Sequence, residues 1–97
     1  MPDDPQAVGD IRLTIRERRE LGLTVFNVAR IVRELDQAGE LDRNDRAATS
    51  AQVLERIIAD NPQAVRNAVG ERDWASFLEA LMRFIEAILP IILMFMG

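Results

Sequence analysis

The chain has 97 residues, of which 48% are apolar and 29% charged, and its net charge is −4, a composition typical of one small globular domain. It contains no Cys, His or Tyr, and all twelve basic residues are Arg. These absences exclude disulfide frameworks, thiolate metal sites, cysteine nucleophiles, lysine Schiff bases and any catalytic triad that needs His. We therefore expect no enzymatic activity, no cofactor and no metal.

The first segment, residues 1–9, is predicted to be an acidic N-terminal arm. It lacks the order of basic and then apolar residues that marks a secretory signal, so export by that route is not expected. The expected location is the cytoplasm or a virus particle, and a membrane-associated location is the alternative.

Charge is unevenly distributed along the chain. Residues 11–33 hold six Arg against two Glu, a net charge of +4, whereas residues 34–73 hold nine acidic residues against five Arg, a net charge of −4. A basic front and an acidic middle suit contacts between subunits. We predict a charged contact face made by Arg12, Arg16, Arg30 and Arg33; a solvated surface without a partner is the alternative.

Residues 10–70 are predicted to form a helical module, and its first element spans residues 10–21. Ile11, Leu13 and Ile15 alternate with polar residues, as in a strand. Asp10 as a helix cap, the run of Arg and Glu, and Gly22 as a stop favour a helix instead. We predict a helix here, with a strand over residues 11–16 as the alternative.

Three further helices follow in the module. Residues 24–38 begin at the capping residue Thr24, and residues 44–60 begin at Asn44 or Asp42. Residues 62–69 follow Asn61, whose position before a proline is a strong start signal. Gly39 and Gly70 are predicted to end two of these helices. The apolar stripe predicted for the first of the two longer helices is Val25, Val28, Ala29, Val32 and Leu35. The stripe predicted for the second is Ala47, Ala51, Leu54 and Ile58, widened by Val53 and Ile57.

Residues 22–41 resemble the recognition helix of winged helix-turn-helix regulators. Asn27, Arg30 and Arg33 would then face outward towards a DNA groove. Such domains continue into a basic β-wing, whereas acidic residues such as Glu40 and Asp42 follow here. DNA binding is therefore the third functional hypothesis, and nucleic acid is not an expected partner.

Residues 71–97 form the most distinctive segment, because a helix beginning after Asp73 would be apolar on almost every side. Three charged residues, Glu79, Arg83 and Glu86, recur at spacings of four and three and make one narrow stripe. Counted as a heptad from Trp74, the apolar a, d and e positions form a wide seam, which favours a bundle of more than two copies over a two-stranded coiled coil. The predicted oligomer interface is Trp74, Phe77, Leu78, Leu81, Phe84, Ile85, Ile88, Ile91, Ile92 and Phe95. A helix buried inside one monomer is the alternative.

The end of this helix contains Pro90, which is predicted to kink or end it. Residues 91–96 are all apolar, so they need burial in an assembly or in lipid. A helix over residues 74–96 would be about 34 Å long at ~1.5 Å per residue, enough to cross a bilayer, but its three charges argue against a lone span. Trp74 is predicted to anchor the helix start against the bundle, with a membrane-interface anchor as the alternative.

Taken together, these features predict an all-α bundle of four to five short helices with a long apolar C-terminal helix. The leading functional hypothesis is a non-enzymatic structural protein that self-associates through this helix and binds other assembly proteins, for example as a component of a phage or virus particle. The alternative is a small membrane-active oligomer, such as a pore, that uses residues 74–97.

Overall fold

The computed structural model describes residues 12–42 and 44–96 and folds them into five α-helices, with no strand in this part of the chain. The helices are α1 (Ile15–Glu20), α2 (Val25–Gln37), α3 (Arg46–Asp60), α4 (Pro62–Glu71) and α5 (Trp74–Met96). The predicted all-α bundle with a long C-terminal helix is confirmed.

Helix α1 is shorter than predicted. Thr14 caps it: its side-chain oxygen accepts a hydrogen bond from the backbone N–H of Glu17 (3.0 Å), and the Glu17 carboxylate accepts one from the backbone N–H of Thr14 (2.9 Å). This reciprocal capping box fixes the helix start. The predicted start at residue 10 is therefore wrong. The predicted cap Asp10 lies outside the described residues, and residues 12–16 contain no strand.

Helix α2 lies within one residue of its predicted bounds. Thr24 caps it by accepting a hydrogen bond from the backbone N–H of Asn27 at 3.1 Å. Gly22 and Gly39 were predicted to end helices, and both adopt positive φ angles, of 65° and 74°. A residue with a side chain is strained in this conformation, which explains glycine at both turns.

Helix α3 is capped by Asp45 and not by Asn44 or Asp42. The Asp45 carboxylate accepts a hydrogen bond from the backbone N–H of Ala48 at 3.1 Å. The buried side of α3 is formed by the two residues predicted to widen its apolar stripe, and not by the centre of that stripe. Val53 and Ile57 are completely buried, whereas Ala47, Ala51, Leu54 and Ile58 are exposed or only partly buried.

Helix α4 begins at Pro62 as predicted, with Asn61 at its N-cap position, but the Asn61 side chain has another role. The Asn61 side chain makes no capping hydrogen bond and instead donates to the backbone carbonyls of Ile57 (2.9 Å) and Leu21 (3.4 Å). Gly70 does not end the helix, which continues to Glu71. Because Leu21 is far away in the sequence, this use of Asn61 depends on the tertiary fold.

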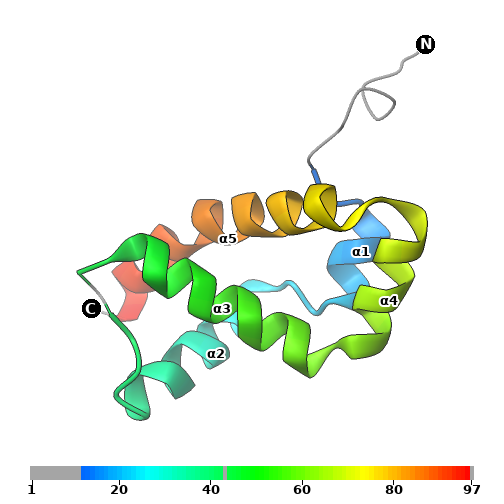
Figure 1. Ribbon diagram of the computed structural model, residues 1–97. Helices are drawn as coiled ribbons and strands as arrows, with labels where there is room; N and C mark the ends of the chain where they lie inside the picture. The colour runs from blue at the N-terminus through cyan, green and yellow to red at the C-terminus, as the bar shows by residue number, and fades with distance from the viewer. Residues whose placement is uncertain (1–11, 43, 97) are drawn as a thin grey trace.

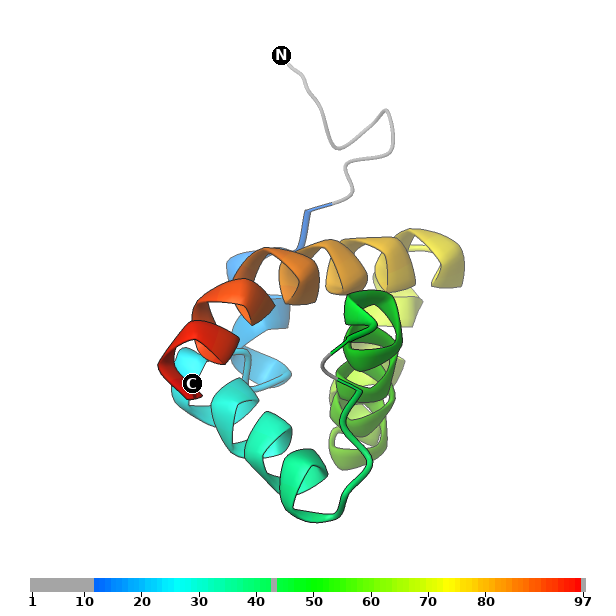
Figure 2. The same ribbon diagram turned by 90° about the vertical axis from the view of Figure 1, so that its left-hand side faces the viewer.

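Helix α5 begins at Trp74 as predicted and continues through Pro90 to Met96. The predicted helix end at Pro90 is therefore wrong, whereas a bend is present: Figure 2 shows the axis of α5 turning towards α2 in its last turns. Proline has no N–H to donate to the carbonyl four residues earlier, at Glu86. Glu86 is exposed, so water can satisfy that carbonyl.

The five helices surround one core. Figure 1 shows α3 running below α5, with α1 and α4 at the end where α5 begins and α2 towards the end where it finishes. Leu81, Ile85 and Leu89 of α5 are completely buried among the other helices, so α5 shares a core with the preceding helices. The other buried apolar residues are Leu13, Leu21, Leu23, Val28, Ile31, Val32, Leu35, Val53, Ile57, Ala64, Ala68, Phe77, Ala80 and Ile92.

Candidate functional site

The predicted oligomer seam is largely occupied within the chain itself. Its residues fall into three groups, with Phe77, Leu81, Ile85 and Ile92 buried, Leu78, Phe84 and Ile88 partly buried, and Trp74, Ile91 and Phe95 exposed. The buried group has no surface left for a second chain. For that part of α5, the alternative of a helix buried inside one monomer describes the structure.

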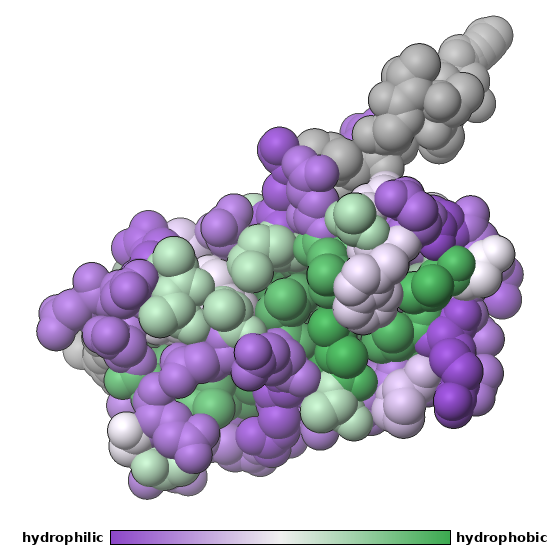
Figure 3. All heavy atoms as spheres, viewed as in Figure 1, coloured by the Kyte–Doolittle hydropathy of each residue, from purple (hydrophilic) through white to green (hydrophobic). Residues whose placement is uncertain are grey.

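Helix α3 provides most of the cover for this seam. Figure 3 shows the face on which α5 lies above α3, where hydrophobic side chains gather between the two helices and hydrophilic ones border them. Two residues of α3 and two of α5 pack against the core while remaining partly exposed: Leu54, Ile58, Phe84 and Ile88. The seam is therefore closed by intramolecular packing.

A different surface, at the C-terminal end of α5, is not covered. Six residues line a hollow of about 330 Å³ between α2 and α5, here called the α2–α5 hollow: Val25, Phe26, Ala29, Arg33, Ile92 and Phe95. Two aromatic side chains stand at this hollow, and Phe26 is 89% exposed and Phe95 81% exposed. Figure 2 shows the end of α5 beside the start of α2. Contiguous exposed apolar side chains of this size mark interaction sites.

The helical period of α2 places Phe26 on the outside. Val28, Ile31, Val32 and Leu35 face the core at spacings of three, one and three residues. Phe26 precedes Val28 by two residues, which rotates its side chain by about 200° to the opposite side of the helix. It is an aromatic residue on the solvent side of an amphipathic helix.

The exposure of Phe95 has another cause. Ile92 is the last buried residue of α5 and is 1% exposed. Phe95 follows it by three residues, where only the first turns of α2 stand beside α5. Ile91 and Met94 are also exposed, by 49% and 76%. We call these two residues together with those lining the hollow the α2–α5 patch.

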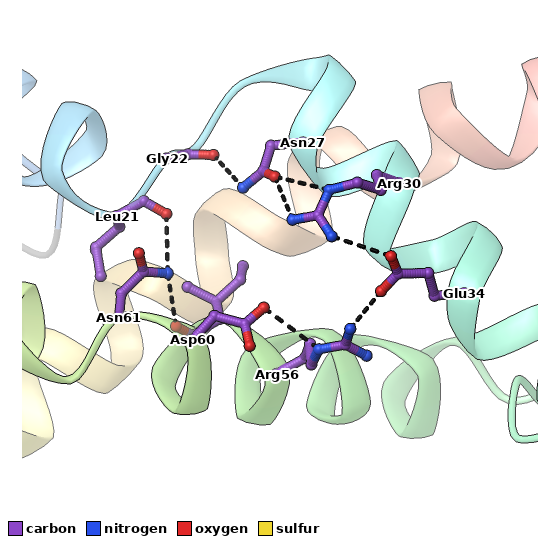
Figure 4. A network of polar contacts seen from close by, with 9 residues as sticks. Leu21, Gly22, Asn27, Arg30, Glu34, Arg56, Asp60 and Asn61 are labelled. Atoms are coloured by element: carbon purple, nitrogen blue, oxygen red, sulfur yellow. Dashed lines mark hydrogen bonds and ion pairs between the residues drawn. The ribbon is translucent and has the colours of Figure 1, made fainter.

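A polar network fixes the start of α2 next to the hollow. The Asn27 amide donates to the Gly22 carbonyl (2.8 Å) and accepts from the Arg30 guanidinium (2.6 Å), as Figure 4 shows. A Cβ atom at Gly22 would lie 3.0 Å from the Asn27 amide nitrogen. Glycine therefore allows both the positive φ and the close approach of Asn27, and the turn holds Phe26 in a defined position.

The same network continues from α2 to α3. Glu34 accepts a hydrogen bond from Arg30 (3.0 Å) and another from Arg56 of α3, and Arg56 also pairs with Asp60 (3.3 Å; Figure 4). Partial burial raises the pKa of Glu34, but the hydrogen bonds and charges of the two arginines outweigh it, so its pKa lies below the ordinary value of 4.5. Glu34 thus links the helix carrying Phe26 to the body of the protein.

The four arginines of the predicted charged contact face lie in different surroundings. Arg16 pairs with Glu20 (3.2 Å) and with Glu71 of α4 (3.3 Å), and these partners raise its pKa. Arg30 belongs to the network around Glu34, and Arg33 lines the α2–α5 hollow. The fourth, Arg12, lines a smaller hollow of about 240 Å³ with Ala80, Arg83 and Phe84. Of the four, the structure places Arg33 at the patch.

A buried ion pair near the start of α5 was not predicted. Arg72 lies 3.3 Å from the Glu17 carboxylate and also donates to the Arg12 carbonyl at 2.9 Å. The Glu17 side chain is 4% exposed and the Arg72 side chain 17% exposed. One indication in the sequence that Glu17 has a structural role is its place three residues after Thr14, which is the spacing of a capping box. Its partner Arg72 could not be identified from the sequence, because the pair joins α1 to the turn before α5.

Reactive side chains do not gather in the part of the chain that the structure describes. No three Asp, Glu, Cys or His residues there are close enough together to hold a metal ion. Ser50 is completely buried, and no hydrogen-bond partner for its hydroxyl is found among the described atoms. A hydroxyl without access to solvent cannot meet a substrate. The α2–α5 patch is therefore the candidate functional site, and its chemistry is that of a binding surface.

Within residues 12–42 and 44–96, no helix combines the length and the apolar composition that crossing a membrane requires. The chain matches no family model, no curated protein and no solved structure. The interpretation of its function therefore depends on the geometry of the patch.

Proposed function

We propose that this protein is a non-enzymatic structural protein that self-associates through the C-terminal end of α5. The observation that carries the proposal is the exposure of Phe26 and Phe95 on either side of an apolar hollow. An aromatic side chain left in water forgoes about 1.5–3 kcal/mol of burial free energy. Two of them on one surface give a partner a large apolar area to cover.

The size of the patch is compatible with self-association. At roughly 200 Å² per phenyl side chain, exposures of 89% and 81% leave about 340 Å² of aromatic surface. Val25, Ile91 and Met94 add exposed apolar area. A stable interface buries roughly 800 Å² per partner. The patch supplies a large part of this area, and surrounding polar residues can supply the rest.

The expected number of copies in the assembly depends on which apolar surface of the chain is left uncovered by its own helices. A bundle of more than two copies was predicted from the wide seam, but α3 covers much of that seam in this chain. The α2–α5 patch lies at one end of the molecule, where a second copy can cover it. In a phage or virus particle, other assembly proteins would then bind the remaining charged surface.

Sedimentation equilibrium of the full chain tests the proposal. We expect the average mass to rise with concentration between about 1 and 100 μM, the weaker range for interfaces of this size. Phe95→Ser should shift the transition to higher concentration. Ile15→Ser is the matched control, because Ile15 is 69% exposed on α1 and does not line the hollow. A wild-type chain that stays monomeric over the whole range would refute the proposal.

DNA binding is the second candidate, and one observation favours it. The short helix α1, the turn at Gly22 and α2 follow one another in the order of a helix-turn-helix, and Leu21 and Leu23 on either side of Gly22 are buried. Against it, Arg30 is paired with Glu34, and the first turn of α2 presents Phe26. We expect no duplex binding at moderate salt. Salt-sensitive retention of a DNA fragment that is lost in Arg33→Ala would favour this candidate instead.

A further inference from the structure

We infer that the self-association is two-fold and reciprocal: Phe26 of each copy docks into the α2–α5 hollow of the other. This inference rests on the proposed function and specifies its geometry. A two-fold interface requires one surface to carry both members of each contact. The α2–α5 patch does so, because Phe26 protrudes from the same surface that contains the hollow.

The hollow has the size needed for a phenyl ring. Its volume is about 330 Å³, and an apolar protein cavity of about 150 Å³ already binds benzene. Two features of the chain create this space. Ala29, the helical neighbour of Phe26 and Arg33, has only a methyl side chain, and Ile92 is withdrawn into the core with 1% exposure. Space therefore remains between the side chains of Phe26 and Phe95.

The residues around the hollow also select an aromatic ligand. Val25, Ala29 and Ile92 give apolar contacts, and Phe95 offers a ring for stacking. Arg33 and the copy's own Phe26 complete the lining, and a guanidinium beside an aromatic ring gains a cation–π interaction. Apolar contacts, a ring and a guanidinium together suit a phenyl group better than an aliphatic chain.

The second copy is the occupant that the structure itself can supply. Phe26 is 89% exposed, more than any other large hydrophobic residue in the described part of the chain. It lies in the first turn of α2, held by the Thr24 cap and by the link from Asn27 to Gly22. Docking such a ring loses little conformational freedom. Because each copy has one ring and one hollow, two contacts form per dimer.

Two variants separate the members of this contact. Phe26→Ala removes the ring and leaves the other five residues that line the hollow in place, whereas Ala29→Met fills the hollow and leaves the ring in place. Each homodimer then lacks both contacts and should dissociate on the order of 100-fold more readily, at ~1.5 kcal/mol per ring. In a mixture of the two, the ring of the Ala29→Met copy meets the open hollow of the Phe26→Ala copy. The mixed dimer keeps one contact and should be only about tenfold weaker than the wild type.

Native mass spectrometry of the mixture, with one variant isotope-labelled, counts the mixed and pure dimers directly. Ile15→Ala and Ala47→Met are the matched controls, because both positions are exposed and neither lines the hollow. Both controls should dimerise like the wild type.

The outcomes separate this inference from the function on which it rests. A dimeric wild type with no enrichment of the mixed dimer overturns reciprocal docking and leaves self-association intact. The same conclusion follows if Phe26→Ala dimerises like the wild type. A wild type that is monomeric up to about 100 μM refutes both. Enrichment of the mixed dimer over both pure variants supports the reciprocal geometry.

Discussion

The two parts of α5 are both strongly apolar but lie in opposite surroundings. In residues 74–89, Phe77, Leu81 and Ile85 are completely buried. In residues 90–96, only Ile92 is found buried among the described side chains, whereas Met94 and Phe95 are 76% and 81% exposed. The difference comes from what stands beside each part, because α3 runs along the first, whereas the start of α2 borders the exposed side of the second. Apolar composition therefore shows that a helix needs a partner, but it does not identify the partner.

The distribution of charge distinguishes the two parts already in the sequence. Glu79, Arg83 and Glu86 give the first part an exposed polar stripe, and Arg83 pairs with Glu79 at 3.4 Å. Residues 90–96 contain no charged residue. A helix with one polar side fits the surface of its own domain, whereas a surface segment that is apolar on all sides indicates a contact with another molecule.

The largest expected effect tests the buried part of this comparison. Phe77→Ala should lower the free energy of unfolding by about 3–5 kcal/mol, because it leaves a cavity where no solvent enters. Phe95→Ala removes the same atoms from a surface site and should change the monomer by about 0.5 kcal/mol or less. Urea unfolding at low protein concentration measures both. Equal losses would mean that the two parts of α5 do not differ in the way described.

A slightly smaller loss of stability is expected when the ion pair between Arg72 and Glu17, next to the start of α5, is broken. Arg72→Met leaves the buried Glu17 carboxylate without its partner and should destabilise the protein by about 3 kcal/mol. Adding Glu17→Gln should recover much of this loss, since the remaining group is neutral. Thermal unfolding of the four proteins in this double-mutant cycle gives the coupling. Additive losses would show that the pair does not hold α1 to the start of α5.

The exposed part of α5 can be removed without touching the core. A chain ending at Leu93 lacks Met94 and Phe95 but keeps all the residues of α5 that are buried among its described side chains. We expect its unfolding free energy to change by about 1 kcal/mol or less, whereas self-association is lost. Removing all of residues 74–97, by contrast, should unfold the protein. If the chain ending at Leu93 kept its dimer, the exposed residues would not form the interface.

Local chemistry allowed much of the fold to be predicted from the sequence. Thr24 as a cap and Gly22 as a turn residue follow from hydrogen bonding and φ preference, which depend on near neighbours. Asn61 occupies the N-cap position of α4, but the use of its side chain could not be predicted, because its hydrogen bond to Leu21 spans forty residues and no local pattern reveals it. The periodicity of the sequence identified the apolar side of α5, but it could not show whether the same chain or a second copy covers that side. Phe26 was not predicted to belong to a contact surface, although an aromatic residue outside the apolar stripe that contains Val28 indicates an exposed apolar side chain.

The smallest expected effect concerns how firmly α2 is held beside the exposed end of α5. Glu34 joins Arg30 of α2 to Arg56 of α3, and these arginines hold its pKa below 4.5 in the folded protein. A carboxyl group with a lowered pKa contributes stability that is complete above the unfolded pKa and is lost as the pH falls through the folded pKa. The contribution is small, because all three side chains are more than a third exposed.

Glu34→Gln tests this link. Its melting temperature should lie slightly below that of the wild type near neutral pH, where the Glu34 carboxylate is charged. The difference should shrink as the pH falls below 4.5, because wild-type Glu34 then becomes neutral as well. Glu55→Gln is a control that removes an exposed acidic group from the neighbouring helix α3. Two melting profiles that stay parallel from pH 3 to pH 7 would show that the charge of Glu34 does not tie α2 to α3, and the position of Phe26 would then depend on the turn at Gly22 and on the buried side of α2.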